Sequence, residues 1–447
     1  MVNDPSAQPL DLAMAPQIEP GRLGNLSPDQ EAKLKEMWGA VLEIFGVAHD
    51  EHQTNGTAPA VKHADPAPKP KARKSLFGKK DKAEVNGTTG GDNDKHGQTK
   101  DFQKAIASHT PEELRQAFWE MTKHDHPDII LLRFLRARKW DVQAALVMLI
   151  STGHWRSSDM HVDDDIMPRG EAYALQQSQQ PSDAAERKEG EDFMAQLRMG
   201  KSFLHGSDKE GRSCCYVRAR LHHGGEQTEK SLERYTVYTI ETARMLLRPP
   251  IETATVVFDL TDFSLANMDY TPVKFMIKCF EANYPESLGS VLVYKAPFIF
   301  RGIWSIIKGW LDPVVASKVH FASNVDELSE WIPRNRIMKE LGGDEDYTYR
   351  YIEPQPGENA AMADTATRDG IMNERKALVG SFESETMSWI SGEDAGQGRS
   401  RLAQRLTENY WKLDPYVRAK SLYDRQGVLG KDGKRDYYPA TTNSELD

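Results

Sequence analysis

The chain has little cysteine and no long apolar run. Its 447 residues include three cysteines, Cys214, Cys215 and Cys279, which are too few for a disulfide framework and are typical of a reducing compartment. A membrane-spanning helix needs about 20 apolar residues, and no stretch of the sequence reaches that length. Residues 1–21 lack the basic and apolar regions of a secretory signal. We therefore expect a soluble, cytoplasmic protein.

Recognisable catalytic signatures are also absent. The sequence has no Gly-x-Ser-x-Gly elbow, no Walker A loop, no His-Glu-x-x-His and no Cys-x-x-Cys. The pair His222–His223 has no third residue at ligand spacing, so we interpret it as exposed polar surface and predict no metal site. The formal net charge of -10 argues against a nucleic-acid partner. These absences predict a protein that is not an enzyme and needs no cofactor.

One dense apolar segment stands out in an otherwise polar chain. It covers residues 296–313, and its apolar side chains are predicted to surround a helix on all sides. Such a helix must be covered on every side, and the covers could be the protein core and a lipid ligand or membrane surface. Arg301 and Lys308 could meet anionic head groups. The apolar side chains are Phe298, Phe300, Ile303, Trp304, Ile306, Ile307, Trp310 and Leu311.

The first hundred residues are predicted to hold a single helix. We expect residues 1–26 to be disordered, residues 27–48 to form an amphipathic helix, and residues 49–100 to be a disordered basic linker. The helix could dock on its own protein or bind a partner or membrane. Within the linker, residues 62–82 hold eight Lys or Arg and two Asp, which could attract anionic lipid or simply be solvated.

Three ordered units are predicted after the linker. Residues 102–158 form a small helical module, and residues 159–347 form a domain in which strands alternate with helices, after a charged connecting stretch at 163–191. This alternation indicates the α/β class, with a mixed or parallel sheet and crossover helices. Residues 348–447 are predicted to be a C-terminal extension with two amphipathic helices, packed on the main domain. The predicted strands are 213–217, 255–260, 290–294 and 318–321.

A segment that is both basic and apolar lies at the C-terminal end of the predicted second helix of the module, residues 128–138. Residues 131–141 interleave apolar side chains with four cations, and the last two, Arg138 and Lys139, fall at the helix end beside an apolar face. Taken alone, this pattern equally fits a helix whose terminal cations offset its dipole.

With Trp155-Arg156, that segment resembles the N-terminal module of the CRAL-TRIO family, and four later segments resemble the family's lipid-binding domain. They follow in the family's order over roughly residues 102–347, and the nearest members are fungal phosphatidylinositol transfer proteins. The resemblance implies an N-terminal helical module and a mixed, mostly parallel sheet flanked by helices around a lipid cavity. A mobile helical gate at residues 298–311 would close that cavity. The four segments are Thr255–Leu260, Asn283–Glu286, Val293–Phe298 and Leu311–Lys318.

The resemblance also implies site residues. The family's phosphoinositide head-group positions correspond to Arg138, Lys139, Glu286 and Lys318; cations suit a phosphodiester, and a carboxylate can accept hydrogen bonds from inositol hydroxyls. The family threonine three residues before the lysine is Val315 here, so one phosphate hydrogen bond is expected to be missing. The implied gate and cavity residues are Phe298, Phe300, Ile303, Trp304, Ile307, Trp310 and Leu311.

A second head-group site of the family does not carry over. Relatives that also bind phosphatidylcholine have Ser and Thr where this chain has Ala254 and Val256, and Tyr where it has Cys215. We expect phosphatidylinositol binding to be retained and phosphatidylcholine binding to be weakened or lost. A more apolar second ligand, such as a sterol or squalene-like lipid, is an alternative.

The expected function is non-enzymatic exchange of phosphatidylinositol between membranes through a gated cavity. The carrier would be a monomer that visits intracellular membranes peripherally, with phospholipid and a transient membrane surface as its partners. Two alternatives stay open. The protein could sense a lipid and present phosphatidylinositol to a lipid kinase, or it could be a scaffold without lipid whose arms, residues 27–46 and 358–447, recruit proteins.

Overall fold

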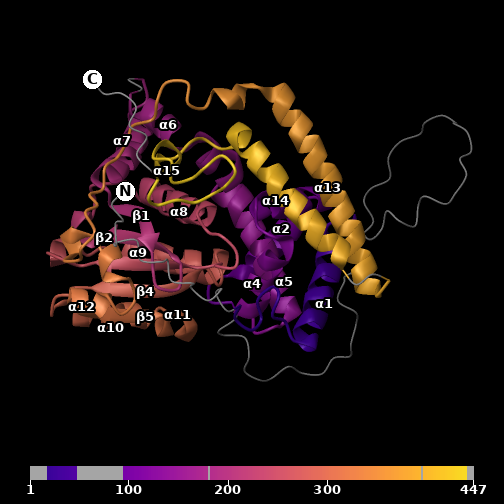
Figure 1. The fold of residues 1–447 in the computed structure, drawn as a ribbon, viewed down its shortest axis with the longest axis horizontal. Helices are drawn as coiled ribbons and strands as arrows, with labels where there is room; N and C mark the ends of the chain where they lie inside the picture. Colours follow the sequence, from indigo (N-terminus) through magenta and orange to yellow (C-terminus); the bar gives the residue numbers. More distant parts are fainter. Residues whose placement is uncertain (1–17, 48–93, 180–181, 394–395, 440–447) are drawn as a thin grey trace, which may run out of the picture.

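The structure, a computed structural model, describes residues 18–47, 94–179, 182–393 and 396–439. The molecule has a helical half and an α/β half that lie side by side (Figure 1). The N-terminal helix, the module helices and the two long C-terminal helices form the helical half, whereas the sheet and its covering helices form the other.

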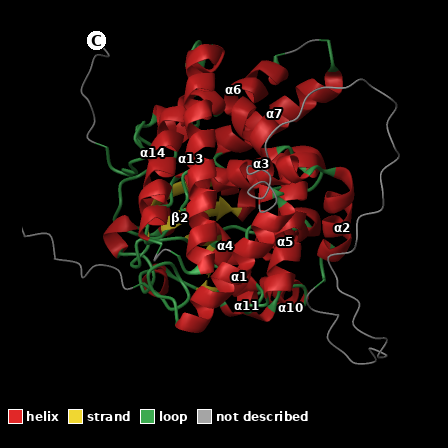
Figure 2. Ribbon diagram, turned by 90° about the vertical axis from the view of Figure 1, so that its right-hand side faces the viewer, coloured by secondary structure: helices red, strands yellow, loops and turns green. Residues whose placement is uncertain are grey.

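The helical half shares one apolar core. Trp38 of α1 packs edge-on against Phe118 of α3, with ring centroids 5.8 Å apart, and in a tilted arrangement against Phe382 of α13, with centroids 5.7 Å apart. Helices α13 and α14 run side by side across this half (Figure 2). The N-terminal helix and the C-terminal extension are therefore integral to the module. The helices are α1 (Pro28–Ile44), α2 (Gln98–Ser108), α3 (Pro111–Thr122), α4 (Pro127–Ala137), α5 (Val142–His154), α13 (Thr365–Ser391) and α14 (Gln397–Val417).

A buried ion pair joins four of these helices. The Arg399 guanidinium donates to both carboxylate oxygens of Asp128, at 3.1 and 2.5 Å, and to Thr386 Oγ1 at 2.9 Å. Trp38 Nε1 donates to the same carboxylate at 2.7 Å. Burial alone would raise the pKa of Asp128, but the Arg399 charge holds it below its usual value. The contacts tie α1 and α4 to α13 and α14.

Two predicted boundaries are wrong. Residues 18–26 were predicted to be disordered, but they are ordered against the rest of the protein, and Arg22 forms an ion pair with Glu252 at 2.9 Å. The predicted linker also ends too late, because α2 begins at Gln98 and Lys95 already pairs with Glu281 at 2.8 Å. Long-range ion pairs and the contacts of Leu23 and Leu26 with the helical core hold these segments, so no apolar periodicity marked them. Residues 1–17 and 48–93, including the basic stretch at 62–82, lie outside the described residues.

The charged stretch at 163–191, predicted as a connection, is mostly helical. It contains α6 (Met167–Ser178) and the start of α7 (Ala184–Met199), two helices that pack on each other. Gly190 allows their close approach, because a Cβ there would lie 2.5 Å from the backbone nitrogen of Ser178. Their polar outer faces masked the helical pattern.

The α/β half contains a five-stranded sheet with the strand order β1-β2-β3-β4-β5. Strand β1 is antiparallel to β2 and the other neighbours are parallel, which confirms the predicted α/β class with a mixed, mostly parallel sheet. Strand β1 was missed, because its Ser-Phe-Leu-His-Gly-Ser sequence does not alternate. The strands are β1 (Ser202–Ser207), β2 (Ser213–Arg218), β3 (Ala254–Asp259), β4 (Leu288–Tyr294) and β5 (Val319–Ala322).

Because the parallel strands follow one another in space as in sequence, right-handed crossovers place their helices on one face of the sheet. The opposite face, with Tyr216, Val257 and Leu292, is filled by apolar residues from the chain at 325–349. The C-terminal residues Tyr423 and Tyr437 pack at the β1 side. No helix in the described part of the chain is long and apolar enough to cross a membrane. Besides α6 and α7, which pack on α8, the helices of this half are α8 (Glu229–Met245), α9 (Tyr270–Lys278), α10 (Phe300–Lys308), α11 (Pro313–Ser317), α12 (Val325–Leu328) and α15 (Leu422–Arg425).

The Asp128–Arg399 pair gives a stability prediction. Replacing Arg399 by Met should lower the free energy of unfolding by about 3–5 kcal/mol, because Asp128 is left buried without its counter-charge. The double variant D128N/R399M should recover part of that loss. Urea unfolding followed by circular dichroism measures both, and Arg401→Met, an exposed position on the same helix, is the control. Equal stability of R399M and R401M would contradict the prediction.

Candidate functional site

An apolar cavity of about 270 Å³ lies between the sheet and the helices α8, α9 and α10. Alternate residues of the strands line it, among them Cys215, Val256 and Val291, whereas their neighbours Cys214 and Val257 face the opposite side of the sheet. The opposite wall comes from α8 and α9, with Leu232, Ile240 and Met276 among its residues. This is the hollow interior that the resemblance implied.

Helix α10 closes one side of the cavity with an apolar face. Phe300, Trp304 and Ile307 line the cavity, as does Leu311 just beyond the helix, and Ile303 is buried in the same cluster. The outer face of α10 carries mainly charged and small side chains. The prediction that apolar residues surround this helix on all sides is therefore wrong, because most of them share one face.

Two predicted cavity residues lie elsewhere. Phe298 is 81% exposed, ahead of the helix. Trp310 packs edge-on against Tyr270, with centroids 5.2 Å apart, and the Lys274 ammonium lies 4.8 Å from the Trp310 ring. Neither residue lines the cavity.

Several apolar side chains on and around α10 and α11 are exposed to solvent. The ring of Phe321 also packs against Trp304, with centroids 5.4 Å apart, so this surface is continuous with the cavity wall. Exposed apolar clusters of this kind mark interaction surfaces. The exposed residues are Phe298, Ile299, Ile306, Val314 and Phe321.

Among the predicted head-group residues, the structure brings Glu286 and Lys318 together. Lys318 Nζ lies 3.8 Å from Glu286 Oε2 and donates to the carbonyl oxygen of Leu288 at 2.8 Å, and both side chains are 22% exposed. Arg133, which the sequence did not single out, donates to the carbonyl oxygen of Glu286 at 3.2 Å. Glu286 has a φ of +54°, which costs backbone energy, and Arg133 holds the loop in that conformation.

Arg138 and Lys139 do not contact that pair. Arg138 donates to Gln98 Oε1 and lies near Asp312, the residue that caps the start of α11. Burial lowers the pKa of Arg138, although the carboxylate of Asp312 acts in the opposite direction. Since Lys318 directly follows α11, Arg138 and Lys318 flank that short helix. Lys139 is exposed, and its side chain has no partner among the residues described.

A carboxylate fixes the C-terminal end of the predicted gate, residues 298–311. Glu281 accepts the backbone N–H of Asp312 at 2.6 Å and pairs with Lys95 and His96, each at 2.8 Å. Lys95 also donates to the carbonyl oxygen of Trp310. Burial would raise the pKa of Glu281, but the hydrogen bonds from His96 and Lys95 hold it below its usual value. The sequence missed this contact because residues 94–98 fell in the predicted linker.

A polar group, the Lys201 cluster (Lys201, His222, Gln227 and Asp269), lies at one end of the cavity. Lys201 Nζ donates to Gln227 Oε1 at 2.6 Å and lies 3.2 Å from His222 Nδ1, and His222 Nε2 lies 3.3 Å from Asp269 Oδ2. Lys201, His222 and Asp269 line the cavity. The interpretation of His222 as exposed surface was wrong, because its side chain is 13% exposed; His223 is exposed as expected.

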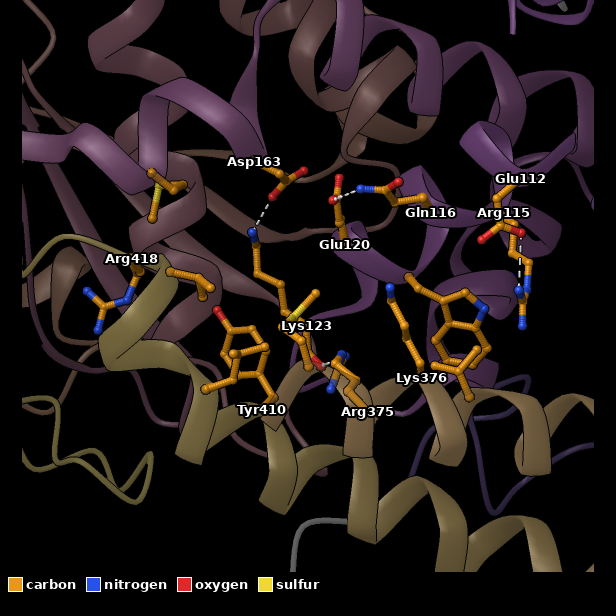
Figure 3. A pocket seen from close by; sticks show the side chains of 16 residues that line it. Glu112, Arg115, Gln116, Glu120, Lys123, Asp163, Arg375, Lys376, Tyr410 and Arg418 are labelled. Atoms are coloured by element: carbon orange, nitrogen blue, oxygen red, sulfur yellow. Dashed lines mark hydrogen bonds and ion pairs between the residues drawn. The ribbon is translucent and has the colours of Figure 1, made fainter. Parts of the chain in front are cut away.

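A second pocket, of about 410 Å³, lies between α3, α13 and α14 (Figure 3). Its charges are largely satisfied internally: Lys123 reaches Asp163, and Gln116 donates to Glu120 at 2.7 Å. Charged side chains are interspersed with apolar ones such as Trp119 and Leu413, so it has no continuous apolar wall and is a crevice between the module and the extension. Within the described ranges, no group of three or more metal-ligating side chains could hold a metal ion.

Comparisons with family models and with two relatives agree with this architecture. Family models described as "CRAL/TRIO, N-terminal domain" and "CRAL/TRIO domain" match residues 98–151 and 197–343. The chain is 42% identical over 424 residues to the "CRAL-TRIO domain-containing protein C3H8.02" of Schizosaccharomyces pombe, covering 92% of each chain. It is 36% identical over 450 residues to the "Phosphatidylinositol transfer protein CSR1" of Eremothecium gossypii, covering 93% of this chain and 100% of that protein. The solved structure described as "Crystal structure of Sfh5" aligns with a TM-score of 0.37 and 16% identity, over 55% of this chain and 77% of that one.

The Glu281 contacts predict how firmly α10 and α11 are held. Replacing Glu281 by Gln should weaken the anchors to Lys95 and Asp312, so amide hydrogen exchange should accelerate at residues 300–317 and stay unchanged in α4. Hydrogen–deuterium exchange with mass spectrometry measures this, with Glu330→Gln, an exposed carboxylate, as control. Unchanged exchange at residues 300–317 in E281Q would contradict the proposed anchor.

Proposed function

The chain belongs to the CRAL/TRIO family, and we propose that it binds phosphatidylinositol in the cavity and exchanges it between membranes without catalysing a reaction. The observation that carries this proposal is an apolar cavity behind α10 whose lining residues Leu288 and Val319 adjoin the Lys318–Glu286 pair. The likeness to a protein named as a phosphatidylinositol transfer protein over the whole of that protein supports it. A hollow interior also favours a lipid carrier over a scaffold.

The energy of lipid extraction explains the need for an enclosed cavity. Burying a methylene group stabilises by about 0.8 kcal/mol. Moving an acyl chain of about 16 carbons from a bilayer into water therefore costs roughly 12 kcal/mol of free energy. A carrier must replace nearly all of that burial. The apolar walls of β2, β3 and β4 and the inner face of α10 supply it, and α10 must move to admit the chains.

The Lys318–Glu286 pair suits an inositol phosphate head. The two groups are partly exposed and 3.8 Å apart, and such a pair contributes only about 0–1 kcal/mol, so a ligand can separate it at little cost. Lys318 would then bind the phosphodiester, and Glu286 would accept hydrogen bonds from inositol hydroxyls. Arg138, at the other end of α11, would add a second positive charge.

The residues that line the cavity support the expectation that phosphatidylcholine binds only weakly. Cys215 and Val256 are neighbours on β2 and β3 and both line the cavity, so the positions at which relatives have Tyr and Thr are apolar here. Burial raises the pKa of the Cys215 thiol to about 12, which leaves it protonated and a poor nucleophile. This environment supports a binding role for the wall and no covalent chemistry.

The exposed apolar cluster supports docking on a membrane. Phe298, Ile299 and Ile306 could insert among lipid chains, while Arg301 and Lys308 lie beside them and suit anionic head groups. We propose that the protein works as a monomer in the cytoplasm and visits membranes peripherally through this surface. A membrane beside α10 would also solvate the apolar face that the helix exposes when it moves.

Transfer of labelled phosphatidylinositol between liposomes tests the function. The native protein should transfer phosphatidylinositol well and phosphatidylcholine poorly, and Lys318→Glu should reduce phosphatidylinositol transfer at least tenfold, because two carboxylates would then face the phosphate. Lys339→Glu, at an exposed lysine away from the cavity, is the matched control. Background transfer by folded native protein, or full transfer by K318E, would refute the proposal.

Docking can be tested separately from binding. Phe298→Asp should reduce association with vesicles of phosphatidylcholine and phosphatidylinositol about 10–150-fold, because burying one aromatic side chain contributes about 1.5–3 kcal/mol. The conservative variant Phe298→Leu should associate nearly normally. Sedimentation with vesicles measures association, and mass spectrometry of co-purifying lipid should show equal loading of both variants. Equal sedimentation of F298D and F298L would rule out a docking role for this residue.

A further inference from the structure

The Lys201 cluster lies at the opposite end of the cavity from Lys318. The carbonyl oxygen of Lys201 accepts the N–H of Arg218, the last residue of β2, at 2.9 Å. The carbonyl oxygen of Lys318 accepts the N–H of Val291, and its ammonium reaches Leu288, where β4 begins. Strands β2, β3 and β4 are parallel, so the end of β2 and the start of β4 lie at opposite edges of the sheet. With a rise of about 3.3 Å per residue, most of the length of a strand separates the two lysines.

Lys201 is a buried cation without a counter-charge. It is 6% exposed, and its two hydrogen-bond partners are the neutral amide of Gln227 and the ring of His222. In the part of the chain that the structure describes, no carboxylate oxygen lies within ion-pairing distance of its ammonium. An ammonium has three donors, so one N–H and the whole charge are left for another group.

Two of the three carboxylates that attract the Lys201 charge are engaged elsewhere, and the third, Glu226, is exposed to solvent. Asp192 pairs with Lys188 and accepts the N–H of Thr228 at 2.8 Å, and Asp269 caps α9 and contacts His222. Burial lowers the pKa of Lys201 to about 8, against the attraction of Glu226, Asp192 and Asp269. Burial also lowers the pKa of His222, and the Lys201 charge adds to that effect. Both effects favour the neutral form of His222, so it adds no charge beside Lys201.

A second polar atom at this end also lacks a partner. Gln196 is fully buried and lines the cavity. Its backbone carbonyl oxygen accepts the backbone N–H of Lys201 at 3.0 Å. Its side-chain Nε2 donates to the Asp192 carbonyl and to Ser231, but its Oε1 has no hydrogen-bond partner. Buried acceptors are rarely left unpaired, so the two observations together indicate a missing polar group.

We propose that the Lys201 end of the cavity is a second head-group subsite, which takes the anionic head of a single-chain amphiphile such as a long-chain carboxylate. The head binds Lys201, and its hydrocarbon chain lies along the apolar wall toward the Lys318 end. A water molecule held with the head, or a hydroxyl group next to it, donates to Gln196 Oε1. This inference rests on the proposed lipid cavity but concerns a ligand other than phosphatidylinositol.

Titration of the delipidated full-length protein with a fluorescent polyene fatty acid, compared with its methyl ester, tests this subsite. The carboxylate should bind more tightly than the ester. Lys201→Met should weaken carboxylate binding about 10–100-fold, because a charge-assisted hydrogen bond is lost, and should leave ester binding unchanged. Lys295→Met, at an exposed lysine beyond the same ends of the strands, is the matched control. Equal binding of acid and ester, or unchanged acid binding by K201M, would overturn the proposal.

Two further measurements separate this subsite from the proposed transfer function. Lys318→Glu should keep carboxylate binding while losing transfer of phosphatidylinositol between liposomes. K201M should also melt no lower than the native protein, because an unpaired buried charge is removed. If K201M lost both activities and its stability, Lys201 would be structural and the subsite refuted; if native protein bound the acid but transferred no phosphatidylinositol, only the transfer function would fail.

Discussion

One face of the sheet must be kept from water, and the molecule is arranged around that requirement. Cys215, Val256 and Val291 line a hollow on that face, whereas the opposite face is filled by side chains from the chain at 325–349. Layered folds bury both faces of such a sheet, and here α8 and α9 cover only part of one. Helix α10 covers the rest with a single apolar face. Filling the hollow with a hydrocarbon chain gains burial free energy without rebuilding the frame around it.

The elements around the cavity are held with unequal strength. The helical half is tied by the buried Asp128–Arg399 pair and by aromatic contacts of Trp38, which join segments far apart in sequence. Helix α10, in contrast, rests on the cavity with an exposed outer face, and the segment after it is fixed mainly by Glu281. Segments with few buried contacts open at the lowest free energy. The contrast makes α10 the element best suited to move while the frame stays intact.

Sequence patterns predicted what depends on local or strongly apolar signals. The alternation of strands and helices indicated the α/β class, and the resemblance placed Glu286 and Lys318, which the structure brings together. Strand β1 was missed because its sequence does not alternate, the helices α6 and α7 because their outer faces are polar, and residues 94–98 because ion pairs hold them. Lys201 was not predicted either, since its partners Gln227 and His222 come from a distant loop. For α10, the apolar content was evident, but its one-sided distribution was not.

The two lysines at the ends of the cavity differ in a way that suits different ligands. Lys318 is 22% exposed beside a carboxylate, so water and Glu286 already satisfy its charge, and a head group there replaces weak contacts. Lys201 is 6% exposed, with no carboxylate bound to it. In such surroundings the effective dielectric constant is low, so an anion gains far more from Lys201 than a neutral group does. The exposed end therefore favours rapid exchange of head groups, and the buried end favours discrimination by charge.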